Sequence, residues 1–433
     1  MRILVKNGRV IDPATKTDKQ LDIYIDNGVI EAVGENLSAE YGELAELEEI
    51  DAAGKIVAPG LVDMHCHLRD PGQEYKEDIE SGTKSAAMGG FTSVACMPNT
   101  DPVIDNAPLV EYVINKAAKV GSVNVYPIGA ISRGLKGELL SDIGELKFAG
   151  AVAVSDDGCP VRNAGLMRRA LEYANMFETL VVSHCEEKEL LDGGVMNEGY
   201  MSTYLGLKGI SNAVEDVQIA RDAILAETTG ARLHICHVST RGGVEIVRQA
   251  KARGVRISAE TCPHYFTLTD KRVEGYDTNA KMNPPLRSQA DLEAVIEGLA
   301  DGTLDVIATD HAPHHIDEKN LEFGEALNGI VGFETALGLG ITHLVKPGKL
   351  ELMDFLAKMT VNPANLLGLN KGMLTEGKPA DIVIFDMNEE YTVDVNRFSS
   401  KSKNSPYDGW KLFGKVEYTI VGGKVVVNQG ILL

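Results

Sequence analysis

Two histidines separated by one residue, His65 and His67, are the first side chains of this chain whose type and spacing suggest chemistry. Residues two apart on a β-strand point to the same face, so both imidazoles could bind one metal ion. A pair of ordinary histidines is the plainer interpretation. A metal site is favoured because Arg69 continues the same alternation and because Pro71-Gly72 begins a loop where these side chains would emerge.

Three more residues with metal-binding side chains follow runs of apolar residues: His184, His237 and Asp310. Each of them alone is more often a polar residue with an ordinary hydrogen bond. Four histidines and an aspartate at the ends of predicted strands are harder to explain in that way, because zinc and similar divalent ions bind imidazole and carboxylate together. The set exceeds what one tetrahedral ion needs. We therefore predict two divalent ions per chain, with zinc as the expected metal.

Strand alternation helps to choose between neighbouring candidates. Asp156 shares a face with two bulky valines, whereas Asp157 follows an alanine and a serine on the other face. Small side chains suit the narrow interior of a barrel near a metal, so we choose Asp157. His234 lies three residues before His237 and would face the other side of its strand. We expect His234 to be structural.

The central part of the chain alternates between buried strands and amphipathic helices. Strands are predicted at 56–64, 91–97, 123–130, 149–155, 179–185, 231–238, 255–262 and 304–309, and helices at 77–88, 107–119, 164–175, 213–228, 242–253, 289–300 and 332–345. This pattern favours a (β/α)₈ barrel of the TIM type over an open doubly wound sheet, which usually has a Gly-rich phosphate loop. Reactive groups of such a barrel gather at the carboxyl ends of its strands.

Short β-rich segments joined by tight turns occupy both ends of the chain. Asn7-Gly8 and Asn27-Gly28 are turn signals near the amino end, and Val421 to Val427 has the same character near the carboxyl end. Neither block is large enough for a core of its own, so we expect them to pack together as one small β-sandwich. The predicted division is therefore a β-sandwich domain of residues 1–57 and 366–433 and a barrel domain of residues 58–365.

Composition limits the classes of partner. The formal charge of −21 argues against nucleic acid or an anionic membrane as a partner, because both would be repelled. No apolar stretch approaches the length of a membrane span and the amino end has no long apolar signal, so we expect a cytoplasmic protein. The six cysteines form no Cys-x-x-Cys pair, and we expect free thiols in small buried positions.

Four motifs resemble the amidohydrolase superfamily, and within it the dihydroorotase family of the bacterial class I type. They are the segment from Pro59 to Arg69, Met97-Pro98-Asn99-Thr100, the segment from Ala308 to His314, and Gly377-Lys378-Pro379-Ala380-Asp381. The resemblance covers essentially the whole chain. It implies a metal-dependent barrel with a β-sandwich from both termini. It also implies the reversible cyclisation of N-carbamoyl-L-aspartate to L-4,5-dihydroorotate, a step of de novo pyrimidine biosynthesis.

The resemblance also assigns roles to individual residues. It makes His65, His67 and Asp310 ligands of one zinc ion and His184 and His237 ligands of the second, with Asp157 as the bridge, Asp310 as the catalytic acid and base, and His67, Arg69, Asn99, Asn283, His314, Asn328 and Gly329 as substrate contacts. Many relatives bridge with a carboxylated lysine, but no lysine lies between Gly150 and Cys185. Leu327-Asn328-Gly329 departs from the Pro-Phe-Gly of class I enzymes, which is tolerable if only backbone groups touch the ring. His311 and His315 are expected in loop packing or at the surface.

Two alternatives remain open at this point. A related cyclic amidase, such as a hydantoinase, dihydropyrimidinase or allantoinase, would share the metals but would not need Arg69 and Asn99 to hold a carboxylate. A non-catalytic scaffold for aspartate transcarbamoylase would not need the full set of ligands. The resemblance leads us to expect a homodimer, with association with aspartate transcarbamoylase as a further option.

Overall fold

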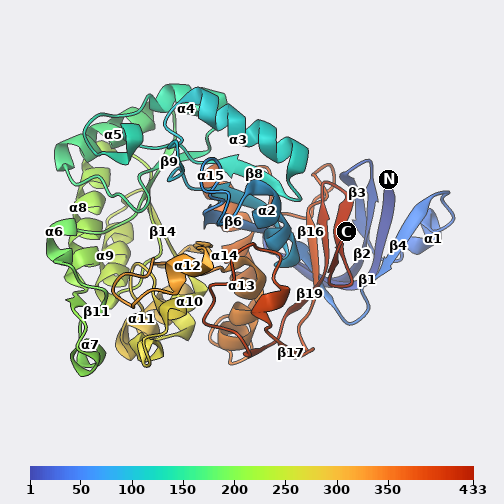
Figure 1. The fold of residues 1–433 in the computed structure, drawn as a ribbon. Helices are drawn as coiled ribbons and strands as arrows, with labels where there is room; N and C mark the ends of the chain where they lie inside the picture. Colours follow the sequence, from blue (N-terminus) through green and yellow to red (C-terminus); the bar gives the residue numbers. More distant parts are fainter.

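Eight parallel strands form a closed barrel in the computed structural model, which describes residues 1–433 (Figure 1). The strands are β6 (Leu61–Cys66), β7 (Phe91–Cys96), β8 (Asn124–Pro127), β9 (Ala153–Ser155), β10 (Leu180–Ser183), β13 (Leu233–Ile235), β14 (Ile257–Thr261) and β15 (Val306–Ile307). They pair in this order as a three-stranded and a five-stranded sheet. Bridges between Gly129 and Val154 and between Cys66 and His311 join the two sheets into a barrel.

The predicted helices surround the barrel, and each lies within a few residues of its predicted bounds. They are α2 (Ile79–Met88), α3 (Ala107–Val120), α5 (Ala164–Met176), α8 (Ala213–Thr229), α9 (Arg241–Ala252), α11 (Gln289–Ala300) and α13 (Phe333–Gly340), which continues as a π-helical turn over Ile341–Val345. Side chains fix several amino ends, since Asp78 and Ser81 form a capping box at α2 and Ser288 and Asp291 form another at α11.

Among the helices of seven or more residues, three were not predicted: α4 (Ile143–Ala149), α14 (Leu352–Met359) and α15 (Val361–Leu367). The predicted strand at 149–155 is wrong at its start, because α4 ends at Ala149 and β9 begins only at Ala153. Leu367 of α15 packs in the same cluster as Met64, Ala153 and Val306, which fill the barrel interior. The shorter elements are α1 (Ser38–Tyr41), α6 (Lys188–Leu191), β11 (Met196–Asn197), α7 (Tyr200–Leu205), β12 (Gly209–Ile210), α10 (Pro263–Thr267), α12 (Ile316–Lys319), β17 (Tyr391–Thr392) and β18 (Lys411–Leu412).

Strands from both termini share one nine-stranded sheet beside the barrel (Figure 1). Its members are β1 (Arg2–Asp12), β2 (Thr17–Asp26), β3 (Val29–Gly34), β4 (Leu47–Asp51), β5 (Ile56–Pro59), β16 (Ile382–Asp386), β19 (Lys415–Val421), β20 (Lys424–Asn428) and β21 (Ile431–Leu432). The antiparallel pair β5 and β16 joins the two ends of the chain. Apolar side chains of these strands supply most of a separate core of 16 buried residues. This architecture confirms the predicted barrel with a β-sandwich domain, whereas the bounds of the two domains stay a prediction.

Gly60 separates the sandwich from the barrel. The strand predicted at 56–64 is in fact two strands, because β5 ends at Pro59 and β6 begins at Leu61. The Gly60 N–H donates to Asp381 O at 2.9 Å, and a Cβ at Gly60 would lie 2.1 Å from the Thr92 methyl group. Only glycine fits such a close approach. No helix of the structure combines the length and apolar character needed to cross a bilayer.

We predict that Gly60→Ala lowers the midpoint of thermal unfolding, because the added methyl group overpacks the junction at a cost of about 1–3 kcal/mol. Gly324→Ala is the matched control, since a Cβ there meets nothing within 4 Å. Calorimetry of both variants tests the prediction. Equal unfolding midpoints for the two variants would contradict it.

Candidate metal centre and substrate site

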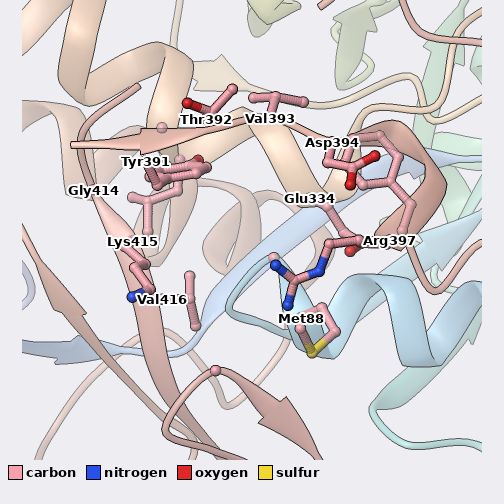
Figure 2. Close-up of a pocket in the computed structure, with 15 residues that line it drawn as sticks. Met88, Glu334, Tyr391, Thr392, Val393, Asp394, Arg397, Gly414, Lys415 and Val416 are labelled. Carbon is pink, nitrogen blue, oxygen red and sulfur yellow. The ribbon is translucent and has the colours of Figure 1, made fainter. Parts of the chain in front are cut away.

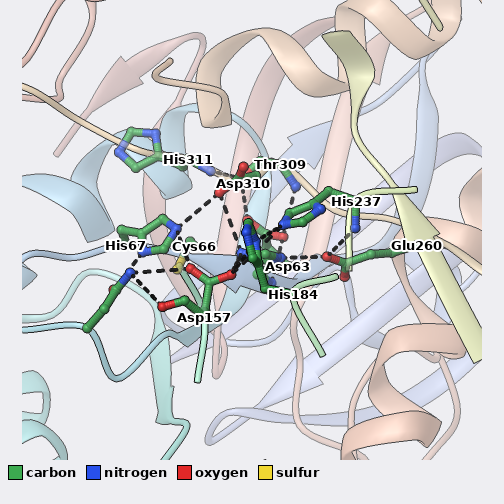
Figure 3. Close-up of polar contacts among 12 residues, drawn as sticks. Asp63, Cys66, His67, Asp157, His184, His237, Glu260, Thr309, Asp310 and His311 are labelled. Atoms are coloured by element: carbon green, nitrogen blue, oxygen red, sulfur yellow. Dashed lines mark hydrogen bonds and ion pairs between the residues drawn. The ribbon is translucent and has the colours of Figure 1, made fainter. Parts of the chain in front are cut away.

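Six predicted metal ligands lie together at the carboxyl ends of the barrel strands (Figure 3). They come from several different parts of the barrel wall: His65 and His67 at the end of β6, Asp157 after β9, His184 after β10, His237 after β13, and Asp310 after β15. All but Asp310, which is partly buried, are at most 5% exposed. The cluster is therefore a product of barrel closure, which brings positions 65 and 310 to adjacent strands.

The Asp157 carboxylate lies among all four histidines. Its Oδ1 is 3.4 Å from His65 Nε2, 3.6 Å from His184 Nδ1 and 3.9 Å from His237 Nε2, and its Oδ2 is 3.6 Å from His67 Nε2. Burial alone would raise the pKa of Asp157, but the neighbouring imidazoles outweigh burial and hold it well below its ordinary value. The carboxylate is thus ionised and central.

Asp156 points away from this cluster, as the alternation along its strand predicts. Its carboxylate accepts from the Ser132 N–H at 2.9 Å and from the Ser132 hydroxyl. Ala153, which shares the face of Asp157, packs in the barrel interior, whereas Val154 packs in the outer core. The choice between the two aspartates therefore agrees with where their side chains lie.

Asp310 contacts the other side of the cluster. Its Oδ1 is 3.0 Å from His67 Nε2 and 3.5 Å from His65 Nε2. Burial would raise the pKa of Asp310, but the charges and hydrogen bonds of the imidazoles, with His65 first, hold it below its ordinary value. The backbone φ of Asp310 is 47° and that of His237 is 34°, both in the left-handed region. Strained backbone of this kind often aims side chains at functional sites.

Hydrogen bonds behind the imidazoles select which ring nitrogen faces the centre. His65 Nδ1 is 2.6 Å from Glu260 Oε1, and His67 Nδ1 is 2.9 Å from Asn99 Oδ1. Both partners are acceptors, so each Nδ1 carries a proton, and each Nε2 would offer a lone pair to a metal ion that displaces its own proton. Burial and the charges on the neighbouring imidazoles of His184 and His65 lower the pKa of His237 to about 3, which keeps the His237 ring neutral.

This donor set fits a divalent metal ion. The ligand atoms of His65, His67 and Asp310 lie within 4.8 Å of one another, and a second such group joins His65, Asp157, Cys236 and His237. His65 Nε2 and Asp157 Oδ1 are buried without a hydrogen-bond partner. Cys236 is an addition that the sequence did not suggest, but burial raises the pKa of its thiol far above the usual range, which disfavours the thiolate that binds metals.

Glu260 and Asp63 support the centre and were not predicted. Glu260 Oε2 contacts His234 Nε2 at 3.1 Å while Oε1 contacts His65, so His234 lies in the layer beneath the centre. Asp63 accepts from the N–H groups of Thr309 and His65. Glu260 is a charged residue within a stretch predicted to be a buried strand, and this feature could have identified it as a candidate.

Two predicted substrate residues, Arg69 and His314, lie beside the cluster. The Arg69 guanidinium is buried, donates from Nε to Pro313 O at 3.2 Å, and has no carboxylate within 4.0 Å. Its Nη2 is 3.4 Å from His314 Nε2. Burial and the Arg69 charge lower the pKa of His314 to about 3, so that imidazole is neutral. A buried cation without a counter-charge is costly, which points to an anionic ligand.

Asn99 and Asn283 lie on other sides of the same region. Asn99 Nδ2 is 3.3 Å from Asp157 Oδ2, and Asn283 Nδ2 donates to Glu186 Oε1 at 2.9 Å. Asn328 O is 2.7 Å from His314 Nε2. The Gly329 N–H donates to Lys281 O at 2.9 Å, so this backbone group already has a partner within the protein.

Three expectations about other residues have different outcomes. All six cysteines are free, but Cys159 is exposed, so its predicted burial is wrong. His315 lies at the surface, as expected, with 43% of its side chain exposed. His311 is fully buried, where its Nδ1 accepts from the Gly332 N–H at 3.1 Å and its Nε2 is 3.4 Å from Glu77 Oε2.

A separate hollow of about 190 Å³ lies between α13 and the carboxyl-terminal strands (Figure 2). Met88, Glu334, Tyr391, Arg397 and Lys415 are among its lining residues. None of the metal-ligand candidates lines this hollow. It is therefore distinct from the site at the carboxyl ends of the barrel strands.

Comparison with known families and structures agrees with this geometry. The profile of the dihydro-orotase-like family matches residues 54–243, and that of the amidohydrolase family matches residues 218–427. The L-hydantoinase (dihydropyrimidinase) of Arthrobacter aurescens superposes with a TM-score of 0.89 at 28% identity over 100% of this chain and 97% of that one. The D-hydantoinase of Thermus sp. does so with a TM-score of 0.85 at 27% identity over 100% of this chain and 96% of that one.

Relatives over the full length are much closer in sequence. The dihydroorotase of Acetivibrio thermocellus is 62% identical over 431 residues, which is 100% of both chains. The dihydroorotase of Ruminiclostridium cellulolyticum is 61% identical over 433 residues, again 100% of both chains. Together with the barrel, the sandwich and the buried histidine and aspartate cluster, this identity shows that the chain belongs to the dihydroorotase family of metal-dependent cyclic amidohydrolases.

Proposed function

We propose that this protein is a dihydroorotase that interconverts N-carbamoyl-L-aspartate and L-4,5-dihydroorotate with a divalent metal centre, as a cytoplasmic enzyme of de novo pyrimidine biosynthesis. The observation that carries the proposal is the buried Arg69 guanidinium, which has no carboxylate partner and lies next to the histidine and aspartate cluster. Both substrates carry carboxylates, and Arg69 supplies local positive charge on a chain of net charge −21.

Two zinc ions per chain are the metals we propose for the centre. His65, His67 and Asp310 would hold one ion, His184 and His237 would hold the other, and Asp157 would lie between them. The support is that Asp157 lies within 3.9 Å of all four imidazoles, while Asp310 Oδ1 faces only His65 and His67. When bound, such ions polarise the amide carbonyl and lower the pKa of a water molecule.

Asp310 is the group we assign to proton transfer. Its Oδ1 faces two imidazoles, which leaves Oδ2 free, and its lowered pKa keeps it ionised, which is the form that can accept a proton. In hydrolysis Asp310 takes a proton from the attacking water and delivers it to the leaving ring nitrogen. In cyclisation the same oxygen receives the proton from the attacking nitrogen and delivers it to the departing hydroxyl group, which leaves as water.

The substrate residues would orient the ring for this transfer. Arg69 would bind the ring carboxylate with its terminal nitrogens, because its Nε already donates to Pro313 O. Asn99, Asn283 and His314 offer amide and imidazole groups around it, and His67 contributes on the metal side. Asn328 and Gly329 would contact the ring through whichever backbone groups the protein leaves unpaired.

The second candidate function is that of a hydantoinase, because the solved structures that match this fold include hydantoinases. Those enzymes act on rings that need no carboxylate clamp, so the buried Arg69 favours dihydroorotate. A non-catalytic scaffold has no use for six clustered metal-binding side chains. A homodimer, and an association with aspartate transcarbamoylase, are further proposals that rest on the family resemblance.

We predict two divalent ions per chain in protein purified without chelators, measured by elemental analysis. The His184→Ala/His237→Ala double variant should lose one ion and most activity, because it removes one ligand set. His315→Ala is a control, since His315 is only partly buried and lies outside the cluster. One tightly held ion in the wild type, with a fully loaded and active double variant, would refute the two-ion centre.

We predict that Asp310→Asn lowers kcat in both directions by about 10²–10⁴, the usual value of general acid–base assistance. Asp305→Asn, at the other end of the same strand, is the control and should retain activity. Steady-state assays with dihydroorotate and with carbamoyl aspartate test this. Near wild-type turnover by the Asp310→Asn variant would mean that another group carries the proton.

We predict that Arg69→Met lowers kcat/KM for dihydroorotate, because a desolvated charge pair is lost. The expected loss of transition-state stabilisation is about 2–5 kcal/mol. Arg69→Lys should lose less, since it keeps the charge but not the planar fork. Any hydantoin turnover should hardly change, because hydantoin has no carboxylate. Equal losses on both rings would instead assign Arg69 to the metal site or the fold.

A further inference from the structure

A buried lysine on α12 has no acidic partner. Lys319 is 2% exposed, and no carboxylate lies within 4.0 Å of its Nζ. The Nζ instead donates to Leu327 O at 2.7 Å, Gly329 O at 3.2 Å and Lys281 O at 3.4 Å. An ammonium group has three donors, so these three backbone carbonyls use all of them.

The three carbonyls belong to two segments with proposed substrate contacts. Leu327 and Gly329 flank Asn328, and Lys281 lies two residues before Asn283. Lys281 O also accepts from the Gly329 N–H at 2.9 Å. Lys319 therefore connects the segment around Asn328 to the segment that contains Lys281 and Asn283.

A residue from the carboxyl-terminal part of the chain contacts the same loop. Asn404 is 4% exposed and donates from Nδ2 to Gly329 O at 2.9 Å and to Ala312 O at 3.1 Å. Its Oδ1 accepts from the His314 N–H at 3.1 Å. Lys319 and Asn404 thus both donate to the same oxygen, Gly329 O. Lys319 precedes Gly329 in the chain, and Asn404 follows it.

Simple packing does not account for Lys319. Burial disfavours its ammonium form and lowers the pKa of Lys319 to about 7. An apolar side chain of similar volume would fill the same space without that cost. What an apolar side chain could not do is hold three carbonyl oxygens of two loops at fixed positions.

We propose that Lys319 and Asn404 are positioning residues that hold His314 and the Asn328-Gly329 loop beside Arg69, and so set the affinity for a ring that carries a carboxylate. This inference rests on the proposed function and deepens it, because it identifies what keeps the carboxylate-binding side of the site in place. Neither residue touches the metal-ligand cluster, so binding should depend on them more than the chemical step does.

Lys319→Met keeps the aliphatic stem and removes the three donors. We expect KM for dihydroorotate to rise about tenfold or more while kcat changes less than about threefold and metal content is unchanged. Amide hydrogen exchange at residues 327–331 should become faster in the free enzyme. Lys358→Met is the matched control, because Lys358 is also buried but donates to Leu304 O at 2.6 Å at the opposite end of the barrel. It should lower the unfolding temperature and leave KM and the exchange at 327–331 unchanged.

Asn404→Asp is an independent second variant of nearly the same shape. It keeps the acceptor for the His314 N–H and turns the donor to Gly329 O and Ala312 O into an acceptor, so it should shift KM in the same direction as Lys319→Met. Unchanged KM and unchanged exchange in a folded Lys319→Met protein would overturn the proposal, as would equal KM shifts in Lys358→Met. A wild-type protein without dihydroorotase activity would refute the proposed function instead, while the exchange measurement would still test the loop contacts.

Discussion

The Asp157 carboxylate is buried among four imidazoles, and the rest of the site depends on this arrangement. A carboxylate taken out of water costs several kcal/mol unless positive or polarisable groups surround it, and unpaired buried imidazoles carry a similar cost. Here each group relieves the others, since the histidines lower the pKa of Asp157 and burial keeps His237 neutral. The same balance keeps the carboxylates ionised and the His237 ring neutral, which are the forms of these side chains that bind a divalent cation.

A second layer of buried polar groups holds both halves of the site in place. Beneath the histidine and aspartate cluster, Glu260 contacts His65 and so fixes the orientation of that imidazole. The substrate side is built differently, from loops that are tied down by buried donors. Arg69 has no carboxylate partner there, and Lys319 and Asn404 place their donors on backbone carbonyls. The carboxyl-terminal part of the chain is thereby connected to the substrate loops, although the sandwich has a separate core of 16 residues.

The sequence by itself determined the class of fold and the family, and it indicated the histidines and aspartates that the structure brings together. The alternation of strands and helices can be recognised in the sequence because buried strands and amphipathic helices each have a local hydrophobic period. The choice of Asp157 over Asp156 needed only the alternation of side chains along one strand. Tertiary structure alone decided how these candidate ligands meet. Between Asp63 and Cys66 strand β6 advances three residues while β7 advances two, from Val94 to Cys96, and this bulge lets both Met64 and His65 face inward.

Other features depended on contacts between residues far apart in the chain, which no local period encodes. His237 reaches the centre through a left-handed backbone position rather than by alternation, since Leu233 and Ile235 pack in the outer core. The close approach of Thr92 requires the glycine at position 60. Glu260, which supports His65, lies 195 residues from it in the sequence, and Asn404, which donates to Gly329 O, lies 75 residues from Gly329. Such partners are chosen by packing and by the need to satisfy buried polar groups, so they could be identified only once the barrel was closed.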